Sequence, residues 1–166
     1  MAISSSARML IFAIPEDKEV LASFGALAIR HTQLDHILKM TIRSLTGLLI
    51  NEVLDATARN GSSELRKRID KIAKQKLGEG EALLKLQAFL ERARNITNQR
   101  NKFMHSLWAH ELDGSSIIKD ENHNWGPIPN ADQLQALSEK ITQLIEELND
   151  ARLHGFLHEA LKRRNI

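Results

Sequence analysis

Apolar residues recur at helical spacing along most of the chain, and the first such stretch reaches from Pro15 to about Leu45. Proline suits the first turn of a helix, and the acidic pair after it faces the positive end of the helix dipole. The line of residues that would face a core advances by alternating steps of four and three: Val20, Phe24, Leu27, His31, Leu34, Leu38, Thr41 and Leu45. This spacing predicts one long amphipathic helix.

Four further helices follow from the same pattern and from their end signals. Gly47 ends the first helix, Ser62 or Ser63 caps the third, and Asn130 with Gln133 resembles a capping box. The fourth helix begins near Glu81 and is expected to end between residues 105 and 110. The other three are expected over residues 48–58, 62–77 and 131–163.

The chain lacks helical periodicity before the first helix and again between the fourth helix and the last. Residues 1–14 are expected to form an N-terminal arm, and residues 113–129 an ordered loop or a small hairpin around Asp113-Gly114. The sequence therefore predicts an all-α fold: one domain of residues 1–166, an antiparallel bundle of four to five helices. Its two long members, the first and the fourth, are expected to pack together.

The composition limits the possible binding partners of the protein and its cellular compartment. Lysine and arginine number 23 against 21 acidic residues, so a net charge of +2 gives no general argument for nucleic-acid binding. The absence of cysteine excludes disulfides and thiolate metal sites and fits a cytoplasmic protein. The apolar run from Met9 to Ile14 is too short to span a membrane, so no membrane association is expected.

Charged side chains interrupt the apolar lines of both long helices. On the fourth helix, Arg94, Asn98, Asn101 and His105 share one polar line, whereas Arg100 falls on the apolar one. A guanidinium on a core-facing line requires a carboxylate, a phosphate or access to water. Asp35, on the first helix, also interrupts an apolar line.

Arg100 and Asp35 would be natural partners if their helices pack. The pair would either orient the guanidinium for a ligand or be a purely structural ion pair. On an ideal helix Arg100 points about 140° away from His105. The two groups can therefore meet only if the arginine curls round, if the helix end is distorted, or if a second copy of the chain completes the site.

The segment Arg100-Asn101-x-x-x-His105 resembles the Arg-x(4 to 6)-His motif of the HEPN superfamily. The long first helix with Asp35, the loop that carries Trp108 and the final amphipathic helix are also similar to that family, over most of residues 15–162. The resemblance implies a metal-independent endoribonuclease that acts as a homodimer on RNA, as a toxin with a cognate antitoxin protein or as a phage-defence effector.

The resemblance also implies roles for the motif residues. His105 would be the acid and base, Arg100 the phosphate ligand and Asn101 a polar support. RNA supplies its own nucleophile, the 2′-hydroxyl, so the protein must provide proton transfer and charge stabilisation. The alternative is a non-catalytic module of HEPN type that binds a nucleotide or a partner protein, such as an antitoxin or a nucleotidyltransferase.

Other side chains are weaker candidates for RNA contacts. Arg94 and Asn98 would extend the cleft, and Trp108 and Trp125 could stack a base, although packing is the favoured interpretation for both. The candidate phosphate contacts are lysines: Lys102, Lys67, Lys71 and Lys74. His154 and His158 have the spacing of a metal pair but no third ligand beside them, so we expect no metal site and no cofactor.

Overall fold

The computed structural model describes residues 10–12, 14–112, 114–120 and 122–164, and most of them lie in helices. The helices are α1 (Lys18–Thr46), α2 (Ile50–Ala56), α3 (Ser62–Leu77), α4 (Glu81–Met104), α5 (Ala131–Leu153) and α6 (Phe156–Arg164). The strands are β1 (Leu10–Ile11), β2 (Leu107–Glu111), β3 (Ser116–Lys119) and β4 (Trp125–Pro127). The expectation of a helical bundle is confirmed.

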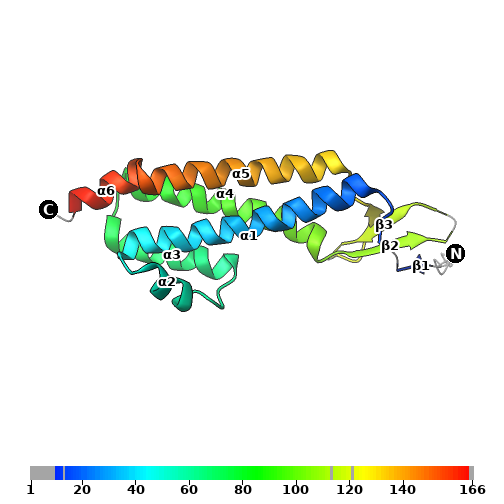
Figure 1. Ribbon diagram of the computed structural model, residues 1–166, viewed down its shortest axis with the longest axis horizontal. Coiled ribbons are helices and arrows are strands. Elements are labelled where there is room, and N and C mark those ends of the chain that lie inside the picture. The colour runs from blue at the N-terminus through cyan, green and yellow to red at the C-terminus, as the bar shows by residue number, and fades with distance from the viewer. Residues whose placement is uncertain (1–9, 13, 113, 121, 165–166) are drawn as a thin grey trace, which may run out of the picture.

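The long helices lie side by side in an elongated bundle, with the strands at one end and α6 at the other (Figure 1). Helix α4 runs antiparallel to its neighbours, whereas α1, α3 and α5 all run in one direction (Figure 1). The parallel arrangement of α1 and α3 arises because α2 and the segment after it return the chain before α3 begins. As a result, the first turn of α3 lies beside the middle of α1.

The first and fourth helices do not pack directly along each other, contrary to the sequence-based expectation. Helix α1 packs along α5 and α3, and α4 packs against the same two helices from the opposite side. The expectation failed because α5 is a third long helix and supplies an apolar face of its own. Side chains of α1 and α4 still meet across the bundle, as Leu27, Leu34, Ala93 and Ile96 share one core cluster.

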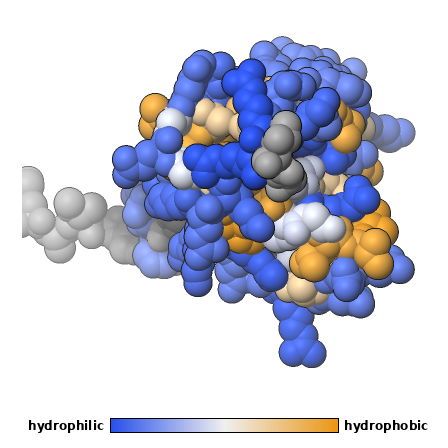
Figure 2. Space-filling view, turned by 90° about the vertical axis from the view of Figure 1, so that its left-hand side faces the viewer, coloured by the Kyte–Doolittle hydropathy of each residue, from blue (hydrophilic) through white to orange (hydrophobic). Residues whose placement is uncertain are grey.

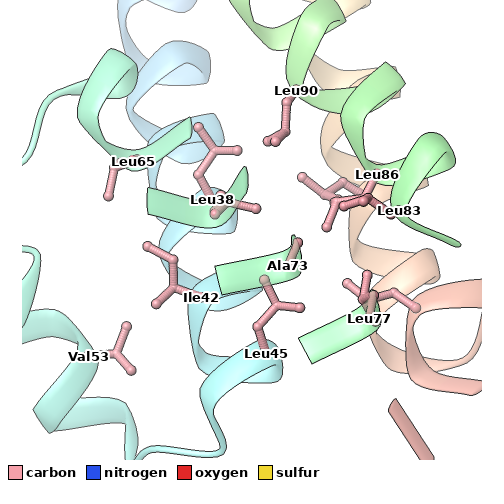
Figure 3. Close-up of a cluster of buried hydrophobic side chains, with 13 residues drawn as sticks. Leu38, Ile42, Leu45, Val53, Leu65, Ala73, Leu77, Leu83, Leu86 and Leu90 are labelled. Atoms are coloured by element: carbon pink, nitrogen blue, oxygen red, sulfur yellow. The ribbon is translucent and has the colours of Figure 1, made fainter. Parts of the chain in front are cut away.

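The apolar core consists of two clusters along the bundle axis. One lies toward the end that carries α6 and joins all six helices, through residues such as Leu38, Leu65 and Leu86 (Figure 3). The other lies toward the strands and includes Val20, Leu137 and Ile141. Polar residues of α1, α3 and α4 gather beside these clusters, and they form the site described below.

The expected hairpin is confirmed, and it is part of a four-stranded antiparallel sheet in the order β1-β2-β3-β4. Strands β2 and β3 pair with Ala109 opposite Ile117, and both of these side chains are buried. Strand β1 belongs to the N-terminal arm and pairs with β2, with Leu10 opposite Glu111. The rest of the arm, residues 1–9 and 13, lies outside the described residues.

The predicted ends of the helices are partly confirmed. The capping box before α5 is present, because Asn130 Oδ1 accepts a hydrogen bond from Gln133 N at 2.8 Å and Gln133 Oε1 accepts one from Asn130 N at 3.0 Å. The prediction that Ser62 or Ser63 caps α3 is wrong. Gly61 is the cap, and its N–H donates to Glu64 Oε2 at 3.1 Å. The Ser62 hydroxyl is therefore available for another partner.

Two predicted helices end earlier than expected. Helix α4 ends at Met104, with His105 as its cap residue. The single last helix is divided at His154-Gly155, where both N–H groups donate to the carbonyl oxygen of Asp150 at 2.9 Å. A Cβ atom at Gly155 would lie 3.0 Å from Ala151 Cα, so this close return of the backbone favours glycine.

The end of the molecule away from the sheet is largely hydrophilic, with separate apolar patches (Figure 2). Exposed Leu48, Leu49 and Ile50 lie there, in and beside the connection from α1 to α2. Within the described part of the chain, no helix is both long enough and apolar enough to cross a membrane.

The core of α4 offers a matched test of the fold. Leu86 is 0% exposed and Leu84 is 66% exposed, although they lie two residues apart on α4. We expect Leu86→Ala to lower the free energy of unfolding in urea by about 2 to 5 kcal/mol, because it leaves a cavity in the core. Leu84→Ala should change it by less than about 0.5 kcal/mol. Equal effects of the two substitutions would contradict the described packing.

Candidate functional site

Polar side chains of α1, α3 and α4 surround a hollow of ≈ 590 Å³, which we call the arginine cleft. Three arginines line it, Arg66 from α3 and Arg94 and Arg100 from α4. The other lining residues are His31, Thr32 and Asp35 from α1, Gly61, Ser62 and Ser63 at the start of α3, and Thr97, Asn98 and Asn101 from α4. The cleft thus exists only because three helices meet there.

The hydroxyl of Thr97 is the point where side chains of the three helices meet. It donates to the carbonyl oxygen of Ala93 at 2.8 Å, so its one hydrogen is used. Arg66 Nη1 donates to Thr97 Oγ1 at 3.3 Å, and His31 Nε2 lies 3.2 Å from the same oxygen. Because Thr97 can only accept from His31, we infer that the imidazole carries its proton on Nε2.

His31 is buried, with only 5% of its surface exposed. Burial lowers the pKa of His31, the nearby carboxylate of Asp35 opposes this effect, and the positive charges of Arg100 and Arg66 add to it. His31 Nδ1 lies 3.8 Å from Asp35 Oδ2, which is beyond hydrogen-bond distance. These influences favour the neutral imidazole, with Nδ1 as the unprotonated nitrogen.

The expected pair of Asp35 with Arg100 is not formed as a direct ion pair among the described residues. Asp35 Oδ1 instead accepts a hydrogen bond from the Ser62 hydroxyl at 2.5 Å. Arg100 Nη1 donates to Asn101 Oδ1 at 3.0 Å. The expectation assumed direct packing of α1 on α4, whereas the first turn of α3 reaches Asp35 in the observed fold.

Arg66 and Arg100 are half-buried, and both lack an ion-pair partner within the described part of the chain. Burial lowers the pKa of each guanidinium, and the negative charge of Asp35 opposes this for both. Arg94 lowers the pKa of Arg66 further. Arg100 Nε is buried without a hydrogen-bond acceptor among the described residues. The cleft therefore holds cations whose donors are largely unused.

A second hollow, of ≈ 530 Å³, lies at the C-terminal end of α4, and we call it the His105 groove. It is lined by Asn98, Asn101, Lys102, His105 and Ser106. His105 is exposed, and its backbone N–H donates to the carbonyl oxygen of Asn101 at 3.0 Å. Asn98 and Asn101 line both hollows, so the groove and the arginine cleft adjoin along α4.

Arg100 and His105 line different hollows of one chain, as their angular separation on the helix predicted. The sequence analysis placed Asn101 on the polar line of His105, apart from the line of Arg100. Asn101 Oδ1 nevertheless accepts a hydrogen bond from Arg100. Asn101 therefore connects the guanidinium on one side of α4 to the groove on the other.

The lysine candidates differ in their positions. Lys102 lines the His105 groove, and Lys67 lies with Arg66 and Arg94 around a hollow of ≈ 420 Å³ beside the arginine cleft. Lys74 is bound to Asp70, with 2.6 Å between Nζ and Oδ2. Lys71 is exposed. The structure thus brings Lys102 to the His105 groove and Lys67 to the hollow beside the arginine cleft, and it leaves the other two outside these linings.

Both tryptophans are half-buried and make contacts within the fold. Trp108 Nε1 donates to the carbonyl oxygen of Phe103 at 2.9 Å, and its ring meets Phe24 edge-on at 5.1 Å between centroids. Lys119 Nζ lies 5.6 Å from the centre of the Trp125 ring. The preferred interpretation, packing rather than base stacking, agrees with these contacts.

The sequence analysis gave no site role to Arg66, Ser62 or Thr97, and it placed His31 only on the core-facing line of the first helix. A lone arginine or threonine on a helix carries no local signal, because its partners come from other helices. The sequence does contain one local signal for the free Ser62 hydroxyl, at the start of α3. Glu64 stands three residues after Gly61, and this spacing allows a glycine-capped helix whose serines are unused.

Comparison of the chain with protein-family models, with curated proteins and with solved structures found no match. Among the described residues, no group of three or more His, Cys, Asp or Glu side chains is placed to hold a metal ion.

The buried His31 predicts a dependence of stability on pH. Its pKa is lower in the folded protein than in the unfolded chain, so the unfolded chain takes up the proton first as the pH falls. We expect the free energy of unfolding to decrease from pH 7.5 to pH 5, by at most about 1.4 kcal/mol per pH unit for this one proton.

The measurement is urea denaturation of the native protein and of His31→Gln at several pH values. Glutamine keeps a donor for Thr97 but does not titrate, so the decrease with falling pH should be smaller in the variant. Parallel profiles of the two proteins would show that His31 contributes nothing to the pH dependence.

Proposed function

We propose that the protein is a metal-independent endoribonuclease of HEPN type. His105 would act as the acid and base, Arg100 as the phosphate ligand and Asn101 as the polar support between them. The observation that carries the proposal is the position of Asn101. Its Oδ1 binds Arg100 at 3.0 Å, and the same residue forms part of the wall beside His105.

The chemistry needs two things of the protein, and the motif residues offer both. The 2′-hydroxyl of RNA attacks the adjacent phosphorus, the bond to the 5′-oxygen of the next nucleotide breaks, and a 2′,3′-cyclic phosphate remains. An imidazole takes the proton from the nucleophile or gives one to the leaving oxygen. A guanidinium stabilises the charge on the phosphate oxygens. The exposed His105 is accessible to a polynucleotide.

A homodimer would complete this site. Within one chain Arg100 and His105 line adjoining hollows on different sides of α4. A two-fold axis near the end of α4 would set Arg100 of one chain against His105 of the other. A dimeric nuclease of this kind would act in the cytoplasm as a toxin with a cognate antitoxin or as a phage-defence effector, as the resemblance to the HEPN superfamily implies.

The first test is cleavage of single-stranded RNA in the presence of EDTA. We expect His105→Ala to reduce the rate at least about 100-fold, because general acid–base catalysis contributes factors of this size. His36→Ala is the matched control, since His36 is exposed on α1 and lines neither hollow. Thermal unfolding of both variants should be close to that of the native protein. Undiminished cutting by His105→Ala excludes the mechanism.

Mixing two inactive variants tests whether the site is shared between chains. Arg100→Ala and His105→Ala are unfolded, mixed in equal amounts and refolded together, so that their chains exchange between dimers. The mixture should recover about a quarter of the native activity. Half of the dimers then contain both variants, and each of these has one intact site of its two. A site confined to one chain would recover no activity at all.

The competing proposal is a non-catalytic module of HEPN type that binds a nucleotide or a partner protein. The half-burial of Arg100 and its bond to Asn101 favour this alternative, because they give the guanidinium a structural role. In the RNA assay the module would show no cutting by the native protein. Arg100→Ala would then lower the stability without any activity to lose.

A further inference from the structure

The arginine cleft contains more positive charge than its own acidic residue balances. Arg66, Arg94 and Arg100 line it, and Asp35 is the one carboxylate among the described lining residues. Arg94 binds Glu91 at 2.7 Å, but that pair is exposed and Glu91 does not line the cleft. The two deeper guanidiniums therefore face a single carboxylate that is already hydrogen-bonded to Ser62.

The deeper guanidiniums also have unused donors. A guanidinium carries five N–H donors, and one hydrogen bond is described for each of the two, from Arg66 to Thr97 and from Arg100 to Asn101. Both acceptors are neutral oxygens. Arg100 Nε is buried without an acceptor among the described residues, which is uncommon for a polar atom in a folded protein. Apart from this buried Nε, the unused N–H groups of the two arginines are left for a ligand of the cleft.

The protein holds these cations in place before any ligand arrives. Thr97 fixes Arg66, Asn101 fixes Arg100, and the two arginines come from different helices. Helix α3 also begins at the cleft, with Gly61, Ser62 and Ser63 among the lining residues. Its positive dipole end adds to the field of the guanidiniums. An anion in the cleft would therefore require little rearrangement.

We propose that the arginine cleft binds a phosphate monoester, held by Arg66 and Arg100 with Arg94 at its edge. A phosphate monoester carries up to two negative charges and several acceptor oxygens, which match the surplus charge and the forked donors. A volume of ≈ 590 Å³ also accommodates more than a phosphate group alone. The ligand would be a nucleoside 5′-monophosphate or the 5′-phosphorylated end of a strand.

Both proposals use Arg100, but phosphate binding in the arginine cleft can be tested apart from the proposed nuclease function. Arg66 has no role in the cleavage mechanism, and binding can be measured without turnover. Inorganic phosphate, adenosine 5′-monophosphate and a 5′-phosphorylated oligodeoxyribonucleotide cannot be cleaved by attack of a 2′-hydroxyl within a strand. Failure of RNA cleavage and failure of phosphate binding are therefore separate results.

The experiment is isothermal titration of the full chain with these three ligands in 150 mM salt, where weak surface attraction is screened. We expect Arg66→Gln to weaken binding about tenfold, because it removes a charge-assisted hydrogen bond. Lys71→Gln removes one charge from the exposed face of the same helix and should leave the affinity unchanged. Arg66→Lys keeps the charge but loses the fork, so it should give an intermediate affinity.

Several results would overturn the proposal. The proposal fails if none of the three ligands binds, or if Arg66→Gln and Lys71→Gln weaken the binding equally. It also fails if adenosine binds as tightly as its monophosphate. Tighter binding of the monophosphate than of inorganic phosphate would support a nucleotide ligand, and still tighter binding of the oligonucleotide would support a strand end. If Arg66→Gln does not fold, as judged by circular dichroism, the affinity of Arg66→Lys is compared with that of the native protein. The lysine variant should then bind more weakly than the native protein.

Discussion

The hydroxyl of Thr97 accepts hydrogen bonds from side chains of two other helices, and the geometry of the site depends on it. Its only hydrogen goes to the carbonyl oxygen of Ala93 in its own helix, so the oxygen is fixed as an acceptor. Arg66 approaches it from α3 and His31 from α1. Burial at this point lowers the pKa of His31, and Arg66 lies half-buried at the same oxygen. Both groups also interact electrostatically with Asp35.

The direction of α3 explains why cations gather at this place. Because α1 and α3 are parallel, the first turn of α3 lies at the middle of α1 rather than at its end (Figure 1). Ser62 then binds Asp35, and Arg66, one turn later, faces Thr97. The net charge of +2 for the whole chain conceals this local surplus, which arises from the arrangement of three helices.

The proposed nuclease site and the proposed phosphate site share one wall of α4. Asn98 and Asn101 separate the His105 groove from the arginine cleft, and Arg100 is bound to Asn101. A ligand in either hollow would therefore act on the same helix end. This arrangement connects the chemistry of the motif to charged groups on α3 that lie far from it in the sequence.

The sequence by itself determined the helices apart from the break between α5 and α6, the hairpin after α4 and the different directions of Arg100 and His105, because helical and strand periodicity are local properties. It also drew attention to Arg100, since a guanidinium on an apolar line is locally anomalous. Only the tertiary structure decided the partners: α3 and α5 each pack against both α1 and α4, Ser62 binds Asp35, and Arg66 joins the cleft. These contacts depend on competition among surfaces from distant segments, and the pattern within one helix cannot predict which surface binds.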